Sequence, residues 1–416
     1  MSQSQAIPAI AIAGGGVAGL AAALCLARVG LASTIYERAS ELSEVGAGLQ
    51  LSPNALSVMD RLGLLPALQE VGVTADRVVL KRGASGRTIA EVPVHAGDGT
   101  PYLSLHRADL QAVLLQAVRR EPQISLRLGA PIAGVRPGED GVALDLADGG
   151  GNVLADLLIA ADGVGSAVVR QLGLAPATPT GTTAWRTTLA AEDDAAPFPA
   201  AGIRAWLGPK RHAIAYPIRA GRAVNLVLIA QSEDGPDAAT HLAAGFSHWD
   251  AQLLDLCGRA PAPTPWPLFG APASRPFVAG NGRIVLVGDA AHAMAPYAAQ
   301  GAAMAIEDAA VLAEAIFQAA EPRAAAERYE AERRPRIDAV RKRVGFHRFV
   351  YHLAPPFSLG RDMVLAMRPR DALRADLAWL YDWRAPLLAP HRPGTDGIDS
   401  PGRRERRAAS DRLPRP

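Results

Sequence analysis

The chain has 416 residues, of which 49% are hydrophobic and 20% charged, a balance typical of well-cored globular proteins and not of disordered ones. Its length predicts two or three packed units. The formal net charge of +2 gives no electrostatic case for binding nucleic acid, and we expect none to be bound.

Two cysteines, Cys25 and Cys257, stand in apolar surroundings without metal-ligand or CxxC spacing. This pattern favours a reducing, cytoplasmic location. The uncharged stretch at 7–27 could be read as a signal or membrane segment, but it has no basic leader and contains a glycine fingerprint. We therefore expect a buried strand, turn and helix there, and no membrane insertion.

The first of three glycine-and-acid turns follows a predicted strand at 9–13. Gly14, Gly16 and Gly19 form G-x-G-x-x-G and open an Ala/Leu-rich helix, the context in which this motif binds the diphosphate of a dinucleotide. A second predicted strand at 32–36 ends at Glu37, where a carboxylate can bind ribose hydroxyls. Arg38 follows, as either a solvated charge or a cofactor contact.

The next segments are less specific. Gly48 lies in a glycine-bearing loop ahead of a helix predicted from Pro53, which either approaches the cofactor or is an ordinary connection. Arg107 begins a helix predicted to run to about Arg119. It either pairs with Asp109 on the surface or donates to the diphosphate.

The second acid turn is A-D-G-V-G-S at 161–166, where Asp162 ends a predicted strand at 157–161. Residues 174–269 then change in character, with many prolines and alternating strands, and predict a mostly antiparallel sheet above the cofactor. In this sheet His212 and Tyr216 are four positions apart, so strict alternation puts both on one face. A histidine in a strand is either a hydrogen-bonded structural residue or a catalytic one.

The third turn is the sequence's organising stretch, at 283–310. A buried strand ends at Gly288-Asp289, a loop holds Pro296, and small residues Gly301, Ala302 and Ala303 open a long helix. The aspartate can accept hydrogen bonds from a polyol, and the helix start can hold negative charge beside a flat ring. Further on, charged helical segments at 323–343 predict a solvated face, and the patch at 376–382 is expected to dock onto the body. We expect no metal site.

Together these motifs resemble the class A FAD-dependent aromatic hydroxylases, over roughly residues 8–350. The fingerprint with Glu37-Arg38, the A-D-G-V-G-S turn and the run from Gly288 to Ala309 carry the resemblance. The 46–55 segment and the W-L-Y patch near residue 380 are similar to the branch of salicylate hydroxylase, 3-hydroxybenzoate 6-hydroxylase and 6-hydroxynicotinate 3-monooxygenase.

The resemblance implies an α/β fold. It consists of a discontinuous Rossmann-like FAD-binding domain (1–73, 101–173 and 274–350) and a substrate domain (74–100 and 174–273). A C-terminal helical segment is expected at 351–390, and the Pro-, Gly-, Arg- and Asp-rich composition of 391–416 predicts a flexible tail. The resemblance implies non-covalent FAD, transient NADH or NADPH, and hydroxylation of a small aromatic or N-heteroaromatic substrate by O₂ through a flavin C4a-hydroperoxide. We expect the protein to be a monomer or a homodimer. An alternative is a same-fold flavoenzyme acting on a quinone, polyprenyl or antibiotic-like substrate.

The resemblance also implies residue roles. Gly14, Gly16 and Gly19 would hold the diphosphate, Glu37 the ribose, Asp289 the ribityl chain, and Gly301–Ala303 the N1 side of the ring. Arg107 would contact FAD, Asp162 would serve FAD and NAD(P)H, and Pro296 would lie against the ring. His212 and Tyr216 match pocket residues, with His212 the candidate base. Two departures are Val169, where the family has Arg, and Ala298-Ala299, where many members have Gly.

Overall fold

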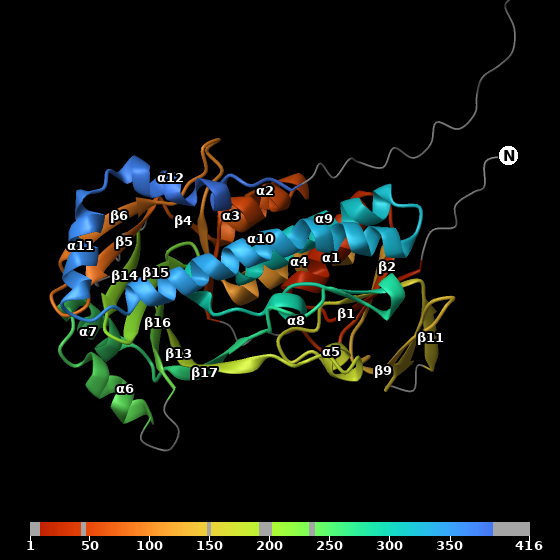
Figure 1. The fold of residues 1–416 in the computed structure, drawn as a ribbon, viewed down its shortest axis with the longest axis horizontal. Helices are drawn as coiled ribbons and strands as arrows, with labels where there is room; N and C mark the ends of the chain where they lie inside the picture. The colour runs from red at the N-terminus through yellow and green to blue at the C-terminus, as the bar shows by residue number, and fades with distance from the viewer. Residues whose placement is uncertain (1–8, 43–46, 148–150, 191–201, 233–237, 386–416) are drawn as a thin grey trace, which may run out of the picture.

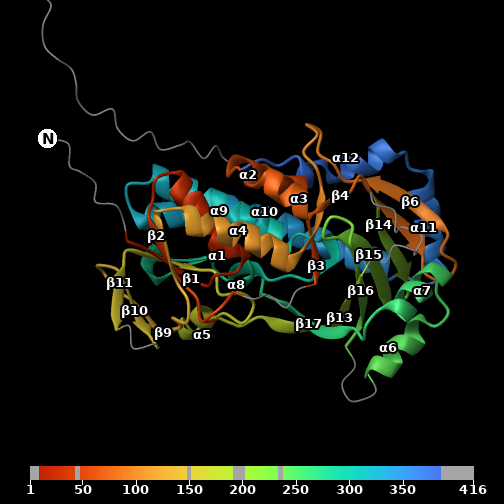
Figure 2. The ribbon, with the colours of Figure 1, turned by 180° about the vertical axis from the view of Figure 1, so that it is seen from behind.

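The computed structural model describes residues 9–42, 47–147, 151–190, 202–232 and 238–385. Two large β-sheets lie toward opposite ends of an elongated molecule, and the 30-residue helix α10 (Pro322–Tyr351) runs along both of them (Figure 1). The view from behind shows helices α1, α4 and α9 stacked together over the first sheet (Figure 2). The prediction for residues beyond 390 lies outside the described part of the chain.

The first sheet has six strands and is parallel except at one edge. Its order is β18 (Val278–Ala279), β19 (Ile284–Leu286), β12 (Leu157–Ala160), β1 (Ile10–Ala13), β2 (Ser33–Tyr36) and β8 (Ile124–Arg127). The apolar runs of β1, β12 and β19 are buried at every residue, as expected for parallel strands covered on both faces. The covering helices include α1 (Val17–Arg28), α4 (Arg107–Arg120) and α9 (Gly301–Gln318).

In the described part of the chain the second sheet has seven strands, of which β14 and β5 pair in parallel and the other neighbours antiparallel. Its order is β17 (Thr264–Gly270), β13 (Thr178–Ala190), β16 (Ala223–Gln231), β15 (Arg211–Ile218), β14 (Gly202–Gly208), β5 (Arg77–Arg82) and β6 (Thr88–Pro93). One face packs Ala213, Ala215 and Trp206 against α6 (Ala238–Phe246) and α7 (Ala251–Arg259). The opposite face carries Ile214 and Tyr216 toward the main core. The predicted fold class is confirmed, while the exact domain boundaries remain predictions.

Smaller elements complete the molecule. A meander is formed by β9 (Ile132–Pro137), β10 (Val142–Leu146) and β11 (Asn152–Ala155), and a second small sheet by β3 (Gly48–Leu51), β7 (Leu103–His106) and β4 (Val73–Thr74). The remaining helical elements are α2 (Pro53–Arg61), α3 (Leu65–Val71), α5 (Ala167–Gln171), η1 (Gly280–Gly282), α8 (Asp289–His292), η2 (Pro296–Ala298), α11 (Phe357–Met367) and α12 (Arg370–Tyr381).

Helix α10 presents the expected solvated face, where Arg323, Glu327 and Arg328 are exposed. On its other side, Arg333 is completely buried, which was not expected. Its guanidinium donates to Glu307 at 2.6 Å and to Asp308 at 2.7 Å, both on α9. Glu and Arg at helical spacing are typical of a surface helix, so this pattern does not indicate that one of the charges meets its partners inside the molecule.

Helix α12 docks onto the body as expected. Leu380 and Tyr381 are buried, and the ring of Tyr381 contacts that of Tyr102 edge to face. The Arg336 guanidinium on α10 donates to the carbonyls of Trp379 and Leu380 at 2.8 and 3.0 Å. Because Arg336 also donates to Glu307 of α9, it links α12 to α9. No helix among the described residues is long and apolar enough to cross a membrane.

Candidate active site

The strand order of the first sheet brings the predicted cofactor residues together. Strands β19, β12, β1 and β2 are adjacent and parallel, and their carboxyl ends lead into Asp289, Asp162, Gly14 and Glu37 respectively. Neighbouring strands are about 4.8 Å apart, so the four turns form one continuous edge. Ligands of open α/β sheets bind at such an edge.

The first turn has its glycines where side chains could not fit. Gly14 adopts φ +102°, and a Cβ on Gly19 would lie 1.9 Å from the carbonyl oxygen of Gly14. A Cβ on Gly16 would meet only open space, which leaves room for a ligand beside the turn. Helix α1 starts here with no side-chain cap and no acid in its first turn. Its N–H groups are therefore available to an anionic group such as a diphosphate.

Glu37 is held in place by the same turn. Its carboxylate accepts from Gly15 N–H at 2.6 Å and from Ala39 N–H at 2.9 Å. Each carboxylate oxygen keeps further acceptor capacity, which suits a ribose hydroxyl pair. Arg38, the next residue, is exposed, which fits both a solvated charge and a contact with a bound cofactor.

The second turn differs from the family pattern in a way the structure explains locally. Asp162 Oδ2 accepts from Ala167 and Val168 N–H at 2.7 and 3.1 Å, so it caps α5, while its Oδ1 is buried without a partner among the described residues. Val169 is buried under α5, and Arg170 donates to the Gly165 carbonyl at 2.6 Å. Arg170 is thus turned onto its own loop.

The third turn is fixed from behind by α9. Gly288 adopts φ +58° and its N–H donates to Asp308 Oδ2 at 2.9 Å. The same oxygen accepts from His292 Nε2 at 2.6 Å, and Oδ1 accepts from Arg333. Burial alone would raise the pKa of Asp308, but the His292 imidazole and the Arg333 guanidinium outweigh it and hold that pKa at about 2. Asp289 itself is exposed at the sheet edge, free to meet a ligand.

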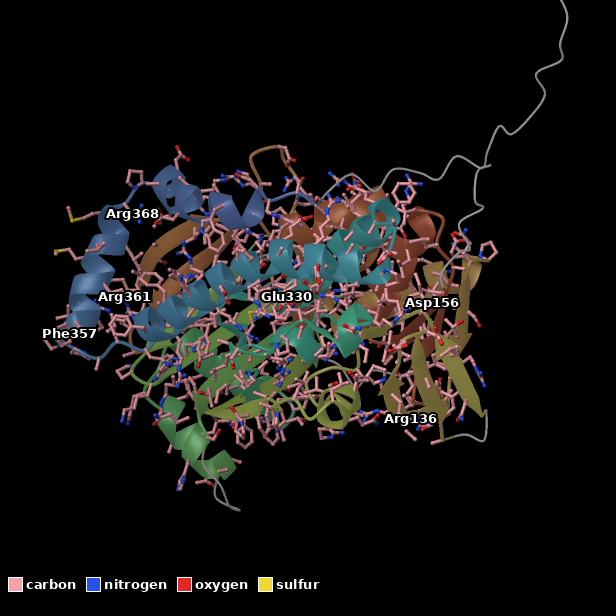
Figure 3. All side chains as sticks on the ribbon, turned by 45° about the vertical axis from the view of Figure 1, so that its right-hand side comes forward. Arg136, Asp156, Glu330, Phe357, Arg361 and Arg368 are labelled. Atoms are coloured by element: carbon pink, nitrogen blue, oxygen red, sulfur yellow. The ribbon has the colours of Figure 1, made fainter. Side chains whose placement is uncertain are left out.

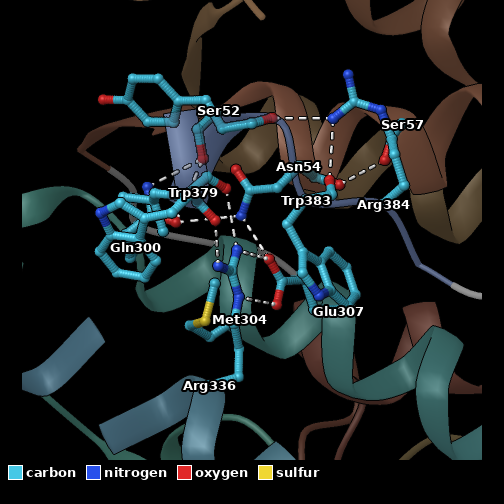
Figure 4. A network of polar contacts seen from close by, with 12 residues as sticks. Ser52, Asn54, Ser57, Gln300, Met304, Glu307, Arg336, Trp379, Trp383 and Arg384 are labelled. Atoms are coloured by element: carbon cyan, nitrogen blue, oxygen red, sulfur yellow. Dashed lines mark hydrogen bonds and ion pairs between the residues drawn. The ribbon is translucent and has the colours of Figure 1, made fainter. Parts of the chain in front are cut away.

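The start of α9 is also prepared for a ligand. Gly301, Ala302 and Ala303 form its first turn, with no acidic residue and no side-chain cap, and a Cβ on Gly301 would meet nothing within 4 Å. Behind it, buried Gln300 donates to Ser52 Oγ at 3.0 Å and accepts from Asn54 Nδ2 at 3.2 Å (Figure 4). Asn54 also donates to Glu307 at 2.6 Å, which ties α2 to α9.

The loop before α9 borders the main cavity. Pro296, Tyr297, Ala298 and Ala299 line a cavity of about 370 Å³ together with Gln50 of β3 and apolar side chains of the second sheet. Its far wall comes from α10, α11 and α12, where Arg361 and Arg368 belong to the lining (Figure 3). Ala299 adopts the left-handed φ of +52°, which explains why many family members place Gly in this loop.

His212 and Tyr216 lie on the sheet face beneath this loop. Both are buried, and Ile214, which stands between them on the same face, lines the cavity. Neither His212 nor Tyr216 is itself part of the cavity wall. The His212 ring contacts Tyr297 and Tyr351, with centroids 5.4 and 5.5 Å apart, and both of these tyrosines do line the cavity. Burial, followed by the neighbouring His352, lowers the pKa of His212 well below its ordinary value.

Gly48 joins the two sheets. Its N–H donates to Asn225 Oδ1 at 2.6 Å, and a Cβ would lie 2.7 Å from both Asn225 and the ring of Tyr216. Burial raises the pKa of Tyr216, so this phenol is neutral at physiological pH. Arg107 begins α4 and its N–H donates to the Ala47 carbonyl beside Gly48 at 3.1 Å. Its charge lies near enough to Arg186 of β13 to help burial lower the pKa of Arg186.

These features fit FAD. The open space at Gly16, the uncapped starts of α1 and α9, and the buried Oδ1 of Asp162 are the kinds of group that a dinucleotide with a flat ring requires. The profile of the "FAD binding domain" family matches residues 8–344. The chain belongs to the FAD-dependent aromatic hydroxylases.

Other proteins similar to this hydroxylase agree with the assignment. The 3-amino-4-hydroxybenzoate 2-monooxygenase PtmB3 of Streptomyces platensis is 35% identical over 91% of this chain and 96% of its own. The 3-hydroxybenzoate 6-hydroxylase of Klebsiella oxytoca is 33% identical over 90% and 96%. The fold is similar to that of a salicylate hydroxylase substrate complex, with a TM-score of 0.75 at 23% identity over 91% and 96%. It is an FAD-dependent monooxygenase, and NAD(P)H is its family's electron donor.

Several residues of the site were not singled out from the sequence. Asp308 supports the Gly288 turn from behind, Arg333 binds both Asp308 and Glu307, and His352 contacts His212. Asp308 and Glu307 stand inside the recognised motif run, so a buried position on α9 could have drawn attention to them. His352 carries no local signal, because its partner is 140 positions away. Among the described residues, no cluster of three or more His, Cys, Asp or Glu could hold a metal.

Proposed function

We propose that this monooxygenase hydroxylates a small aromatic or N-heteroaromatic acid that carries a ring hydroxyl, with NADH or NADPH as reductant and O₂ as oxidant. The observation that carries the proposal is the cavity that the Pro296–Ala299 loop shares with Ile214 of the second sheet. Its volume of about 370 Å³ falls in the range of small-molecule sites, and its walls are mostly apolar. Such walls exclude water from the reacting atoms.

The starts of α1 and α9 and the acids Glu37 and Asp289 would hold the cofactor. In this arrangement Gly14, Gly16 and Gly19 would receive the diphosphate, with Arg107 beside it, and Gly301–Ala303 would lie beside the flat ring. FAD, when bound and reduced by NAD(P)H, supplies the oxygen-activating chemistry. Helix α9 contributes positive potential from its first turn, where negative charge develops on the ring. Pro296 borders the ring on the substrate side.

His212 is the proposed base for the ring hydroxyl, because an electron-rich phenolate is the better acceptor of oxygen. Its Nε2 is buried and has no partner among the described residues. Tyr216, held neutral, is the proposed hydrogen-bond donor on the other side of Ile214.

Arg186 supports an acidic substrate. In the sheet register it stands opposite Val227, which stands opposite Ile214, so all three share the face beneath the cavity. Its Nε is buried without a partner among the described residues. A substrate carboxylate would satisfy this group, since arginine pairs with carboxylates through its planar fork. The named substrates of PtmB3 and of the Klebsiella oxytoca enzyme are hydroxybenzoates, in keeping with this choice.

The test is a panel of hydroxybenzoates, aminohydroxybenzoates and hydroxypyridine carboxylates with the purified flavoprotein. Substrate-stimulated NAD(P)H oxidation is expected, with oxygenated product and not only peroxide, and acids should act better than the matching neutral phenols. Stimulation solely by a prenylated quinone would contradict the proposal.

His212→Ala is expected to retain FAD but to slow hydroxylation by about 10²–10⁴-fold, because the general base is lost. Single-turnover product formation measures this. An unchanged rate would remove His212 from the mechanism.

The proposal places the enzyme in the cytoplasm as a monomer or homodimer. Both cysteines are free, and burial raises the pKa of the Cys25 thiol to about 12, so this thiol is unreactive in the folded chain. Light scattering of the FAD-loaded enzyme gives the oligomeric state.

A further inference from the structure

The second sheet and the end of α10 bring two histidines into direct contact. His212 Nδ1 and His352 Nε2 are 2.9 Å apart, and their ring centroids are 5.1 Å apart. His212 lies on β15, and His352 caps the C-terminus of α10. One of these two nitrogens must carry the hydrogen that the other accepts.

The two outer nitrogens of this pair differ in their surroundings. His212 Nε2 is fully buried and has no partner among the described residues. His352 is only partly buried, and its bond to His212 is its one side-chain hydrogen bond within the described part of the chain. Its Nδ1 is not among the buried unpartnered polar atoms, so this nitrogen is open to water. The pair therefore spans from a dry interior to solvent.

We propose that His212 and His352 form a two-imidazole relay that carries the proton of the substrate's ring hydroxyl out to solvent. The relay rests on the proposed function, because it needs a phenolic substrate and His212 as the base. It adds a second histidine, from a different segment of the chain, as a positioning and proton-passing residue.

A lone buried base would be poorly suited to this task. Burial and His352 lower the pKa of His212, and burial together with Arg348 lowers the pKa of His352 to about 4. Either ring would have to become a cation in an apolar environment, which burial disfavours. A proton that enters at one nitrogen while another leaves from the far end avoids that charge.

The transfer is balanced in three movements. The substrate hydroxyl gives its proton to His212 Nε2, His212 Nδ1–H passes its proton to His352 Nε2, and His352 Nδ1–H releases one to water. Both rings end neutral in the opposite tautomer. When the hydroxylated product leaves as a neutral phenol, it takes a proton back along the same path and restores the starting tautomers.

The relay predicts a pH limit with a defined sign. When His352 is protonated, both its nitrogens carry hydrogens, so His212 Nδ1 must accept and His212 Nε2 must keep its hydrogen. The phenol proton then has no acceptor, and hydroxylation should fall as pH drops toward about 4. Tyr297 and Tyr351, which face His212, have pKa values raised by burial and stay neutral. The Arg348 guanidinium lies close enough to His352 to help burial lower the pKa of that histidine, and burial lowers the pKa of His347, stacked on Tyr351, to about 4.

The experiment compares the FAD-loaded wild-type enzyme with His352→Ala and His352→Gln. The Gln side chain can still hydrogen-bond to His212 but cannot accept a proton at one nitrogen and release another from a second nitrogen. The control is His248→Ala, which removes an exposed histidine. The readouts are the phenolate absorbance of 3-hydroxybenzoate or 3-amino-4-hydroxybenzoate on binding to oxidised enzyme, and product formation in a single turnover.

We expect both His352 variants to slow phenolate and product formation by about 10²-fold, with unchanged FAD affinity and an unchanged His248→Ala rate. Added imidazole should restore part of the rate in His352→Ala, where space is open, and not in His352→Gln. The acid limb near pH 4 should be absent from His352→Gln, which separates His352 from His347.

Wild-type rates in both His352 variants would overturn the relay while leaving the proposed function intact. A slow rate that imidazole does not restore, or an acid limb that persists in His352→Gln, would also overturn it and leave His352 a packing role. If instead the wild-type enzyme forms no product from any phenolic acid, the proposed function itself fails.

Discussion

At the scale of single residues, the most constrained position is Gly48, where the cofactor side meets the second sheet. Its hydrogen atom faces Asn225 and Tyr216 across a gap with no room for a methyl group. Of the two predicted roles of this residue, a cofactor loop or an ordinary connection, its contacts with Asn225 and Tyr216 favour a connection between the sheets.

Gly48→Ala is expected to destabilise the enzyme by about 1–3 kcal/mol, because the added Cβ would overlap both neighbours. It should also shift Tyr216 and weaken substrate binding. Urea unfolding measures the first effect and substrate titration the second.

Gly258→Ala is the matched control, since a Cβ there meets nothing within 4 Å on helix α7. It should be neutral or stabilising, as alanine favours helices. Equal losses in the two variants would show that the contact with Asn225 and Tyr216 is not the cause.

At the scale of elements, helix α9 contributes both to the cofactor site and to the packing of its neighbouring helices. Its first turn faces the cofactor, and its buried acids Glu307 and Asp308 face α10, α2 and the Gly288 turn. Only Asp308 touches the turn that presents Asp289. Asp308 therefore supports the cofactor site, whereas its neighbour Glu307 joins α9 to α2 and α10.

Asp308→Asn is expected to weaken FAD binding about tenfold or more, because the Gly288 N–H and His292 lose a charged acceptor worth about 1.5–3 kcal/mol. Fluorescence titration of the apoprotein with FAD measures the change.

Glu307→Gln is the comparison, because it removes an equally buried charge from Arg333 and Arg336 without touching Gly288. It should lower the melting temperature but alter FAD affinity less. A larger FAD effect in Glu307→Gln would contradict the assigned role of Asp308.

The strands around the cofactor edge could be predicted from the sequence, but contacts between distant segments could not. The strands that end at Gly14, Glu37, Asp162 and Asp289 were predictable, because short apolar runs followed by glycine or acid have few other interpretations. The single face shared by His212 and Tyr216 followed from strand alternation. The burial of Arg333 and the pairing of His212 with His352 were not predictable, since both depend on contacts between segments far apart in the chain.

At the scale of the whole molecule, the C-terminal segment closes the structure around the α9–α10 pair. The ring of Trp383 lies 5.5 Å from the Arg333 guanidinium and 5.1 Å from that of Arg336, while Arg384 pairs with Asp98 at 2.6 Å. This segment thus covers the outer end of the buried charge network.

Trp383→Ala is expected to destabilise the enzyme by about 1–3 kcal/mol, because its half-buried ring loses apolar burial and its cation–π contacts with Arg333 and Arg336. Trp383→Phe should retain part of the cation–π contact and fall in between. Thermal unfolding of the two variants measures the series, and equal melting temperatures for wild type and Trp383→Ala would refute this covering role.

The arrangement of β1, β12 and β19 has one further consequence, for the order of events during synthesis. These neighbouring strands begin at Ile10, Leu157 and Ile284, so the sheet edge that would hold FAD is incomplete until most of the polypeptide has left the ribosome. Strand β5 likewise gains its parallel neighbour β14 only after more than a hundred further residues have been made. Nascent chains of this enzyme should therefore expose unpaired strand edges for a long interval. They should depend on chaperones more than a helical bundle with mostly local contacts would.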